Sequence, residues 1–118
     1  MAKLLLKHQG VTLSSYKLDQ AETSIGRNPD NTIQLDDAAV SGNHARIDRQ
    51  PNEYLENHYD FFIEDLGSTN GTKVNRKRVT RQMLKHDDEL QIGAHHFVFD
   101  SGQVPDLETT AIYLPDED

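Results

Sequence analysis

Apolar and polar residues alternate along most of the first hundred positions, in short runs that turn-forming residues separate. A period of two places neighbouring side chains on opposite faces of a strand, so each run predicts a half-buried β-strand. No stretch keeps a 3.6-residue period with caps, and only RQMLKHDDE, residues 81–89, predicts a single helical turn. The predicted strands are 2–8, 11–18, 22–26, 32–35, 43–49, 58–65, 72–75, 77–80, 88–92 and 95–100.

So many short strands in one hundred residues predict an all-β fold, an antiparallel β-sandwich, because one flat sheet would leave long edges and a broad apolar face exposed. The alternation stops after Asp100. Residues 101–118 contain two prolines, five acidic residues and no Lys or Arg. This composition predicts an acidic flexible C-terminal tail, residues 101–118, beside one folded domain, residues 1–100.

Composition narrows the class of protein. The chain has no cysteine, and none of its apolar runs approaches the ~20 residues of a membrane span. The apolar run near its N-terminus, three leucines, is too short for a secretory signal. These features predict a cytoplasmic protein with no membrane partner. The net charge of −8 argues against a nucleic-acid partner, whose binding depends on a basic face.

One basic cluster interrupts this acidic chain. We interpret it chiefly as a solvated loop edge, with a partner-facing patch as the alternative. Its members are Arg76, Lys77, Arg78, Arg81 and Lys85.

Three polar loops, 24–31, 40–44 and 66–75, carry the candidate chemistry. Loops cluster at the two ends of a sandwich, so these three can converge at one end. Arg27 offers a rigid fork of donors for phosphate or carboxylate, and the hydroxyls of Ser41 and Thr69 suit an anion that needs several donors. The composition favours binding of an anion attached to a peptide.

The three motifs together resemble the forkhead-associated (FHA) domain family. The sequence has Gly26-Arg27, then SGNH at 41–44 after thirteen residues, then STNGTKVN at 68–75. The order of three separated motifs makes the resemblance specific, and it covers roughly residues 3–100. It implies a β-sandwich of about eleven strands whose loops bind phosphothreonine peptides. The implied partners are a phosphothreonine-containing protein and a Ser/Thr protein kinase, with no cofactor.

The resemblance also implies a role for each matching residue. Arg27, Ser41 and Thr69 are expected to contact the phosphate, and Asn70 the peptide backbone beside it. For structural support of the site, the resemblance implies His44 as a brace between loops, and Gly26 and Gly71 as backbone positions.

The chain departs from the family at three positions. Gly42 follows Ser41 where many relatives place a side chain that contacts the peptide. Ala39 is small and uncharged, which predicts an apolar residue three positions after the phosphothreonine. Arg76 replaces a frequent glycine; a positive φ there would cost about 1 kcal/mol, and a different turn would avoid that cost.

The tail contains two candidate phosphosites, Thr109 and Thr110. Phosphorylated Thr109 would place Ile112 three positions on, which fits the preference expected from Ala39. From Asp100 to Thr109 the chain reaches at most ~30 Å, so we expect head-to-tail binding in trans rather than in cis. The alternative is a linker whose threonines have no role.

Three other functions remain open at this stage. Ser41 and His44 could form a hydrolase pair, although no nucleophile elbow or third orienting group is evident. A metal site could use residues of the polar rim, although adjacent histidines on a strand point to opposite faces. An FHA-like scaffold could bind an unphosphorylated partner through a sheet face. The residues considered for the metal are His86, Asp87, Asp88, His95 and His96.

Overall fold

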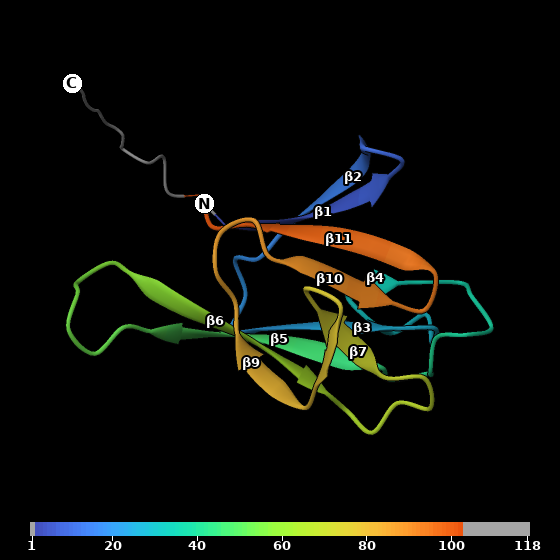
Figure 1. Cartoon of the computed structure of the whole chain (residues 1–118). Coiled ribbons are helices and arrows are strands. Elements are labelled where there is room, and N and C mark those ends of the chain that lie inside the picture. Colours follow the sequence, from blue (N-terminus) through green and yellow to red (C-terminus); the bar gives the residue numbers. More distant parts are fainter. Residues whose placement is uncertain (1, 103–118) are drawn as a thin grey trace.

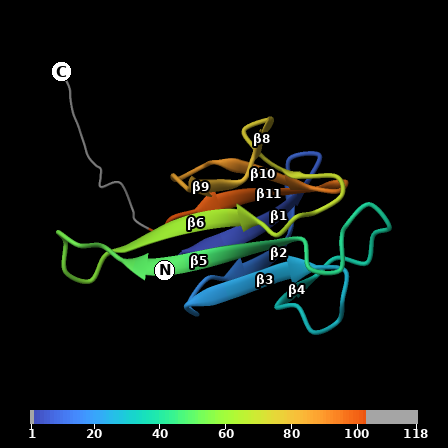
Figure 2. The ribbon, with the colours of Figure 1, turned by 90° about the horizontal axis from the view of Figure 1, so that it is seen from below.

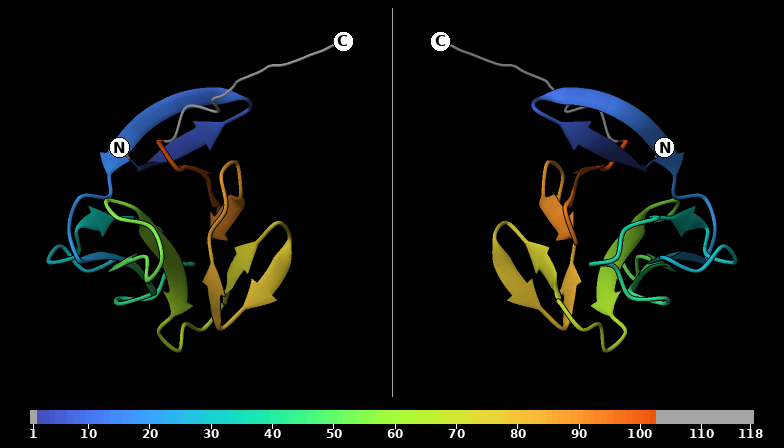
Figure 3. Two further views of the ribbon diagram at one scale, coloured as in Figure 1. Left: turned by 90° about the vertical axis from the view of Figure 1, so that its left-hand side faces the viewer. Right: turned by 90° about the vertical axis from the view of Figure 1, so that its right-hand side faces the viewer.

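The computed structural model describes residues 2–102, which form two β-sheets packed face to face (Figures 1 and 3). No helix among residues 2–102 is long and apolar enough to cross a membrane. The strands are β1 Lys3–His8, β2 Val11–Lys17, β3 Glu22–Gly26, β4 Ile33–Gln34, β5 Ala45–Pro51, β6 Tyr59–Asp65, β7 Thr72–Val74, β8 Lys77–Val79, β9 Arg81–Met83, β10 Glu89–Ile92 and β11 His95–Asp100.

The predicted all-β sandwich is confirmed. One sheet has the strand order β2-β1-β11-β10-β7-β8 and the other β4-β3-β5-β6-β9 (Figure 2). Neighbouring strands are antiparallel, with β3 and β4 as the one parallel pair among the described strands. Ten of the eleven strands lie within or near a predicted run, with ends shifted by at most two residues.

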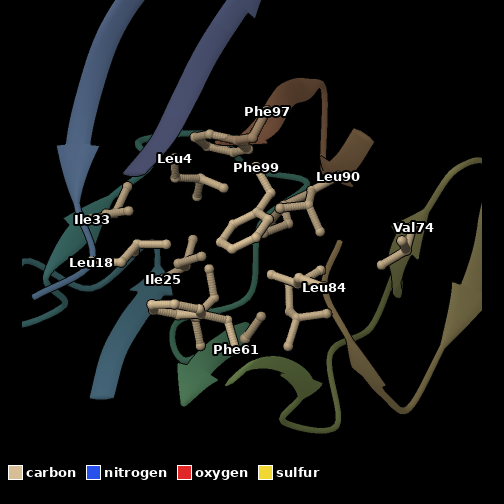
Figure 4. Close-up of a cluster of buried hydrophobic side chains, with 14 of the residues drawn as sticks. Leu4, Leu18, Ile25, Ile33, Phe61, Val74, Leu84, Leu90, Phe97 and Phe99 are labelled. Carbon is tan, nitrogen blue, oxygen red and sulfur yellow. The ribbon is translucent and has the colours of Figure 1, made fainter. Parts of the chain in front are cut away.

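The core lies between the sheets and is built from the inward-facing residues of each alternating run (Figure 4). Leu4 and Phe97 from one sheet and Ile25, Ile47 and Ile63 from the other are at most 1% exposed. Burial of each such side chain contributes roughly 1.5–3 kcal/mol to folding. This core fixes the direction of every strand and therefore which loops meet at each end.

The expectation of a helical turn at 81–89 is wrong, because Arg81–Met83 forms strand β9. β9 pairs with β6, and the Arg81 guanidinium binds Glu64 at 2.8 Å and Asp48, on β5, at 2.9 Å. The backbone N–H of Leu84 donates to the carbonyl of Phe61 at 2.7 Å. These partners lie far away in the sequence, so pairing across the sheet overrides the local preference.

In the β7–β8 hairpin Arg76 takes a positive φ of 73°, after 50° at Asn75, so the chain does not use a turn that avoids this conformation. Two residues with positive φ form the tight turn whose twist matches a hairpin. Asn75 suits this conformation, and its side chain accepts from the Glu89 N–H at 3.0 Å and donates to Asp88 at 2.9 Å.

The ends of the sandwich differ in what they carry. The start of β1 and the end of β11 lie together at the left of Figure 1, while the loops that follow β3, precede β5 and join β6 to β7 lie at the right. Of the predicted tail, only Ser101 and Gly102 belong to the described residues. The candidate phosphosites Thr109 and Thr110 lie outside them.

Candidate functional site

The loops after β3 and before β5 are joined through their backbones. The N–H of Arg27 donates to the carbonyl of Ser41 at 3.0 Å, and the N–H of Asn28 donates to that of Gly42 at 3.1 Å. A Cβ atom on Gly26 would lie 2.2 Å from the Gly42 carbonyl oxygen. Glycine at position 26 is therefore required for this close approach.

A buried asparagine that sequence reasoning missed holds the same junction. The Asn31 side chain is 9% exposed, and its Nδ2 donates to the carbonyl of Gly42 at 2.7 Å and that of Asn28 at 3.0 Å. Its place three residues after Asn28 in the turn-forming NPDN segment was the available signal.

His44 lies between this pair of loops and the loop after β6, and it is completely buried. The backbone N–H of Ser41 donates to its Nδ1 at 3.0 Å, so Nδ1 carries no proton. Its Nε2 lies 2.9 Å from the carbonyl of Gly71 and donates to it. Both ring nitrogens are thus occupied by the backbone, and neither contacts the Ser41 hydroxyl.

The third loop closes against Ser41. The N–H of Thr69 donates to Ser41 Oγ at 3.1 Å, which leaves the hydroxyl proton of Ser41 available to a ligand. Asn70 donates from Nδ2 to the carbonyl of Ala39 at 2.8 Å. Thr69 and Asn70 are exposed. The structure therefore brings the loops that carry Arg27, Ser41, Thr69 and Asn70 together at one rim.

Asp65, at the end of β6, organises this third loop and was missed from the sequence. Its carboxylate accepts from the Gly67 and Ser68 N–H groups at 3.2 and 3.1 Å and from the hydroxyls of Ser68 and Thr72. Ser68 Oγ in turn accepts from the Gly71 N–H at 2.9 Å. Burial raises the pKa of Asp65, but the hydrogen bonds from Ser68 and Thr72 outweigh it and hold the pKa below its usual value.

Asp37 ties the loop before Ser41 to the β10–β11 turn. It accepts from the Ala39 N–H at 2.9 Å and the Ala94 N–H at 3.2 Å. These hydrogen bonds, Ala39 first, lower the pKa of Asp37, with a smaller contribution from His95. Asp37 therefore holds the backbone at Ala39 next to the β10–β11 turn.

The Arg27 side chain is exposed, and within residues 2–102 its guanidinium has no hydrogen bond or ion pair. By contrast, Arg46 and Arg81 each form an ion pair with Asp48. A fork of donors without a protein partner, at a rim with free hydroxyls, can bind a multiply charged oxyanion.

The structure explains why glycine follows Ser41 in this chain. A Cβ there would lie 2.8 Å from the Asn28 side-chain nitrogen, so the Asn28 amide covers the place that a side chain after Ser41 would need. Asn28 is exposed and becomes a candidate peptide contact that the sequence motifs did not indicate.

The residues considered for a metal ion do not converge on one point in the structure. His95 lies 3.4 Å from Asp37, and His86 lies 3.4 Å from Asp87. Asp88 accepts from Asn75 and from the Lys85 N–H. No group of three or more ligand-type residues close enough to hold a metal occurs in the part of the chain that the structure describes.

Comparisons with known proteins indicate the family of this chain. The family model described as FHA domain matches residues 23–93. The glycogen accumulation regulator GarA of Mycobacterium tuberculosis is 44% identical over 101 residues, which cover 86% of this chain and 58% of that protein. The oxoglutarate dehydrogenase inhibitor of Corynebacterium jeikeium is 40% identical over 101 residues, with coverage of 86% and 65%. The chain thus spans about three fifths of the length of these relatives.

Among solved structures, Mycobacterium tuberculosis EmbR in complex with a low affinity phosphopeptide superposes with a TM-score of 0.72 and 35% identity. The match covers 85% of this chain and 24% of EmbR.

Proposed function

The chain belongs to the FHA domain family, and we propose that it is a phosphothreonine-dependent peptide-binding module of Ser/Thr kinase signalling, with no catalytic activity. The structure of EmbR with a phosphopeptide and the regulator and inhibitor names of GarA and its corynebacterial relative support this proposal. The proposed partners are a phosphothreonine-containing protein and a Ser/Thr protein kinase. The proposed location is the cytoplasm, where kinases find ATP.

The observation that carries the proposal is the exposed Arg27 guanidinium beside the backbone junction with Ser41. In the proposed complex Arg27, the Ser41 hydroxyl and Thr69 bind the phosphate, while Asn70 uses its free amide proton and oxygen on the peptide backbone. Phosphothreonine carries roughly −1.5 to −2 charges and three acceptor oxygens. Charge-assisted hydrogen bonds of about 1.5–3 kcal/mol each, less the cost of ordering a peptide, give micromolar affinity.

Geometry disfavours the hydrolase alternative. Ser41 Oγ accepts from the Thr69 N–H, and His44 Nδ1 accepts from the Ser41 backbone rather than from its hydroxyl. His44 therefore has no lone pair with which to deprotonate Ser41. We assign it the supporting role, together with Gly26 and Gly71.

The test is titration of an oriented phosphothreonine peptide library, followed by Arg27→Ala. Loss of two charge-assisted bonds lowers affinity by about a hundredfold or more. Lys17→Ala, which removes an equal charge from exposed strand β2, should leave affinity unchanged. Equal binding of phosphorylated and plain peptides would favour a scaffold for unphosphorylated partners, and unchanged affinity in Arg27→Ala would remove Arg27 from the site.

We also propose that phosphorylated Thr109 or Thr110 of one copy binds the loops of another copy, head to tail. Support comes from the position of the end of β11, at the opposite end of the sandwich from the loops (Figure 1). A segment of nine residues that extends at most ~30 Å would have to be nearly taut to reach its own site. Sedimentation of the phosphorylated chain should show concentration-dependent association, and a monomer at all concentrations would contradict binding in trans.

A further inference from the structure

The outer face of the six-stranded sheet carries a row of hydrogen-bond donors at its loop end. Register places Lys7 opposite His96, His96 opposite Gln91, Gln91 opposite Lys73, and Lys73 opposite Arg78. The flanking residues Leu6, Phe97, Leu90 and Thr72 face the other way, into the sandwich. We call Lys7, His96, Gln91, Lys73 and Arg78 the donor row. It crosses five strands, so at ~4.8 Å per strand its span is about 19 Å.

Among residues 2–102 the cations of this row have no ion-pair partner. Lys73 and Arg78 are exposed and directly opposite, an arrangement of like charges that destabilises a sheet. Within residues 2–102 neither side chain has a hydrogen bond or an ion pair. Glu89 shares this face of β10, yet no ion pair joins it to either cation. By contrast, Arg46 and Arg81 on the other sheet share Asp48 and Glu64.

The donor row is continuous with the candidate site. The Arg78 side chain lies over Gly71, where a Cβ would come within 2.6 Å of its Nε. A recess of about 190 Å³ joins the two regions, and Ala39 and Asn70 line it together with Lys73 and Gln91. A peptide held by Asn70 that passes Ala39 therefore leads onto the row. The basic cluster of the sequence is divided here, since Arg78 joins this face while Arg81 is paired on the opposite sheet.

We propose that the donor row binds the acidic end, residues 116–118, of the phosphorylated tail of a second copy, which deepens the tail binding proposed above and rests on it. Asp116, Glu117 and Asp118 follow Thr109 by seven to nine positions, and Ile112 follows it by three. With Ile112 at the recess beside Ala39, the three acids lie four to six residues further on, or about 13–20 Å in an extended chain. This reach is enough for every cation of the row, because Lys73 lines the recess itself, Arg78 lies one strand away at about 5 Å, and Lys7 lies two strands beyond Gln91 at about 10 Å. The charges of the acids and the row are complementary.

The experiment measures the affinity of two synthetic peptides of residues 105–118, both with phosphothreonine at 109, by fluorescence anisotropy. One has the natural end and the other carries Asp116→Asn, Glu117→Gln and Asp118→Asn. The natural peptide should bind about three- to tenfold more tightly at low salt, as expected for a few exposed ion pairs, and the ratio should fall toward one in 0.5 M salt, where the screening length is only a few ångströms.

The variant Lys73→Gln with Arg78→Gln should bring the ratio close to one. Its matched control is Lys3→Gln with Lys17→Gln, which removes the same charge from the other end of this sheet and should keep the ratio. A ratio of one in the unchanged protein, or an unchanged ratio in Lys73→Gln with Arg78→Gln, would overturn the proposal.

Failure of the tail peptides to bind at all would also exclude this occupant. The wider proposed function is judged separately, since Arg27-dependent binding of a library phosphothreonine peptide would still support it.

Discussion

Replacement of Gly26 by alanine tests whether the backbone junction between two loops, rather than side chains alone, creates the binding rim. The added Cβ would lie 2.2 Å from the Gly42 carbonyl oxygen, 2.7 Å from Asn31 Nδ2 and 2.9 Å from the Gly42 carbonyl carbon. Ordinary contacts begin at 3.4 Å, so the Gly42 carbonyl must move by about 1.2 Å. Backbone conformation adds no further strain, because φ at Gly26 is not positive.

A shift of that size disrupts the hydrogen bonds that the Gly42 carbonyl accepts from Asn28 and Asn31. Overpacking costs about 1–3 kcal/mol, and each buried group left unpaired costs about 1–3 kcal/mol. We therefore expect the free energy of unfolding to fall by about 2–5 kcal/mol. A domain of this size has roughly 5–15 kcal/mol, so a folded protein should persist.

Two measurements are needed: urea denaturation followed by circular dichroism, and titration with a phosphothreonine peptide. We expect affinity to fall at least tenfold, because the displaced loop carries Ser41 away from Arg27. Gly10→Ala is the control, since Gly10 has φ of 80° with nothing within 4 Å, so alanine adds about 1–2 kcal/mol of strain in the β1–β2 turn without a contact to the three loops. The reasoning is refuted if Gly26→Ala binds the peptide within twofold of Gly10→Ala.

Two further predictions concern buried groups that support the loops. His44→Ala leaves the Ser41 N–H and the Gly71 carbonyl unpaired, so the free energy of unfolding should fall by about 2–5 kcal/mol and peptide affinity should fall with it. Urea denaturation and peptide titration measure the two effects. Unchanged affinity would contradict the role of His44 as a brace between the loops. Because the folded-state pKa of Asp65 lies below its unfolded value, its stabilisation is present above about pH 4 and is lost as the pH falls through the folded pKa. Asp65→Asn should therefore reduce the loss of stability at acid pH that urea denaturation measures. The same loss in the variant would show that the Asp65 carboxylate does not cause it.

Local pattern predicted much of the fold. Alternation marked ten of the eleven strands because a strand with one buried face needs a period of two, whatever its neighbours are. Arg81–Met83 was missed because its strand character comes from pairing with β6 and from the bond of Arg81 to Asp48, neither of which a short window contains. The resemblance to the FHA family implied that Arg27, Ser41, Thr69 and Asn70 belong to one site, and the fold brings their loops to one rim.

The sequence by itself determined which residues face the core and which segments form turns, since both depend on neighbours within a few positions. Only the tertiary structure decided that Asn31 and Asp65 hold the loops, and that Arg78 separates from Arg81 to join Lys73, Gln91, His96 and Lys7. Cross-strand register brings together residues as far apart in the sequence as Lys3 and Asp100, and register is set by the packing of a common core rather than by any local preference.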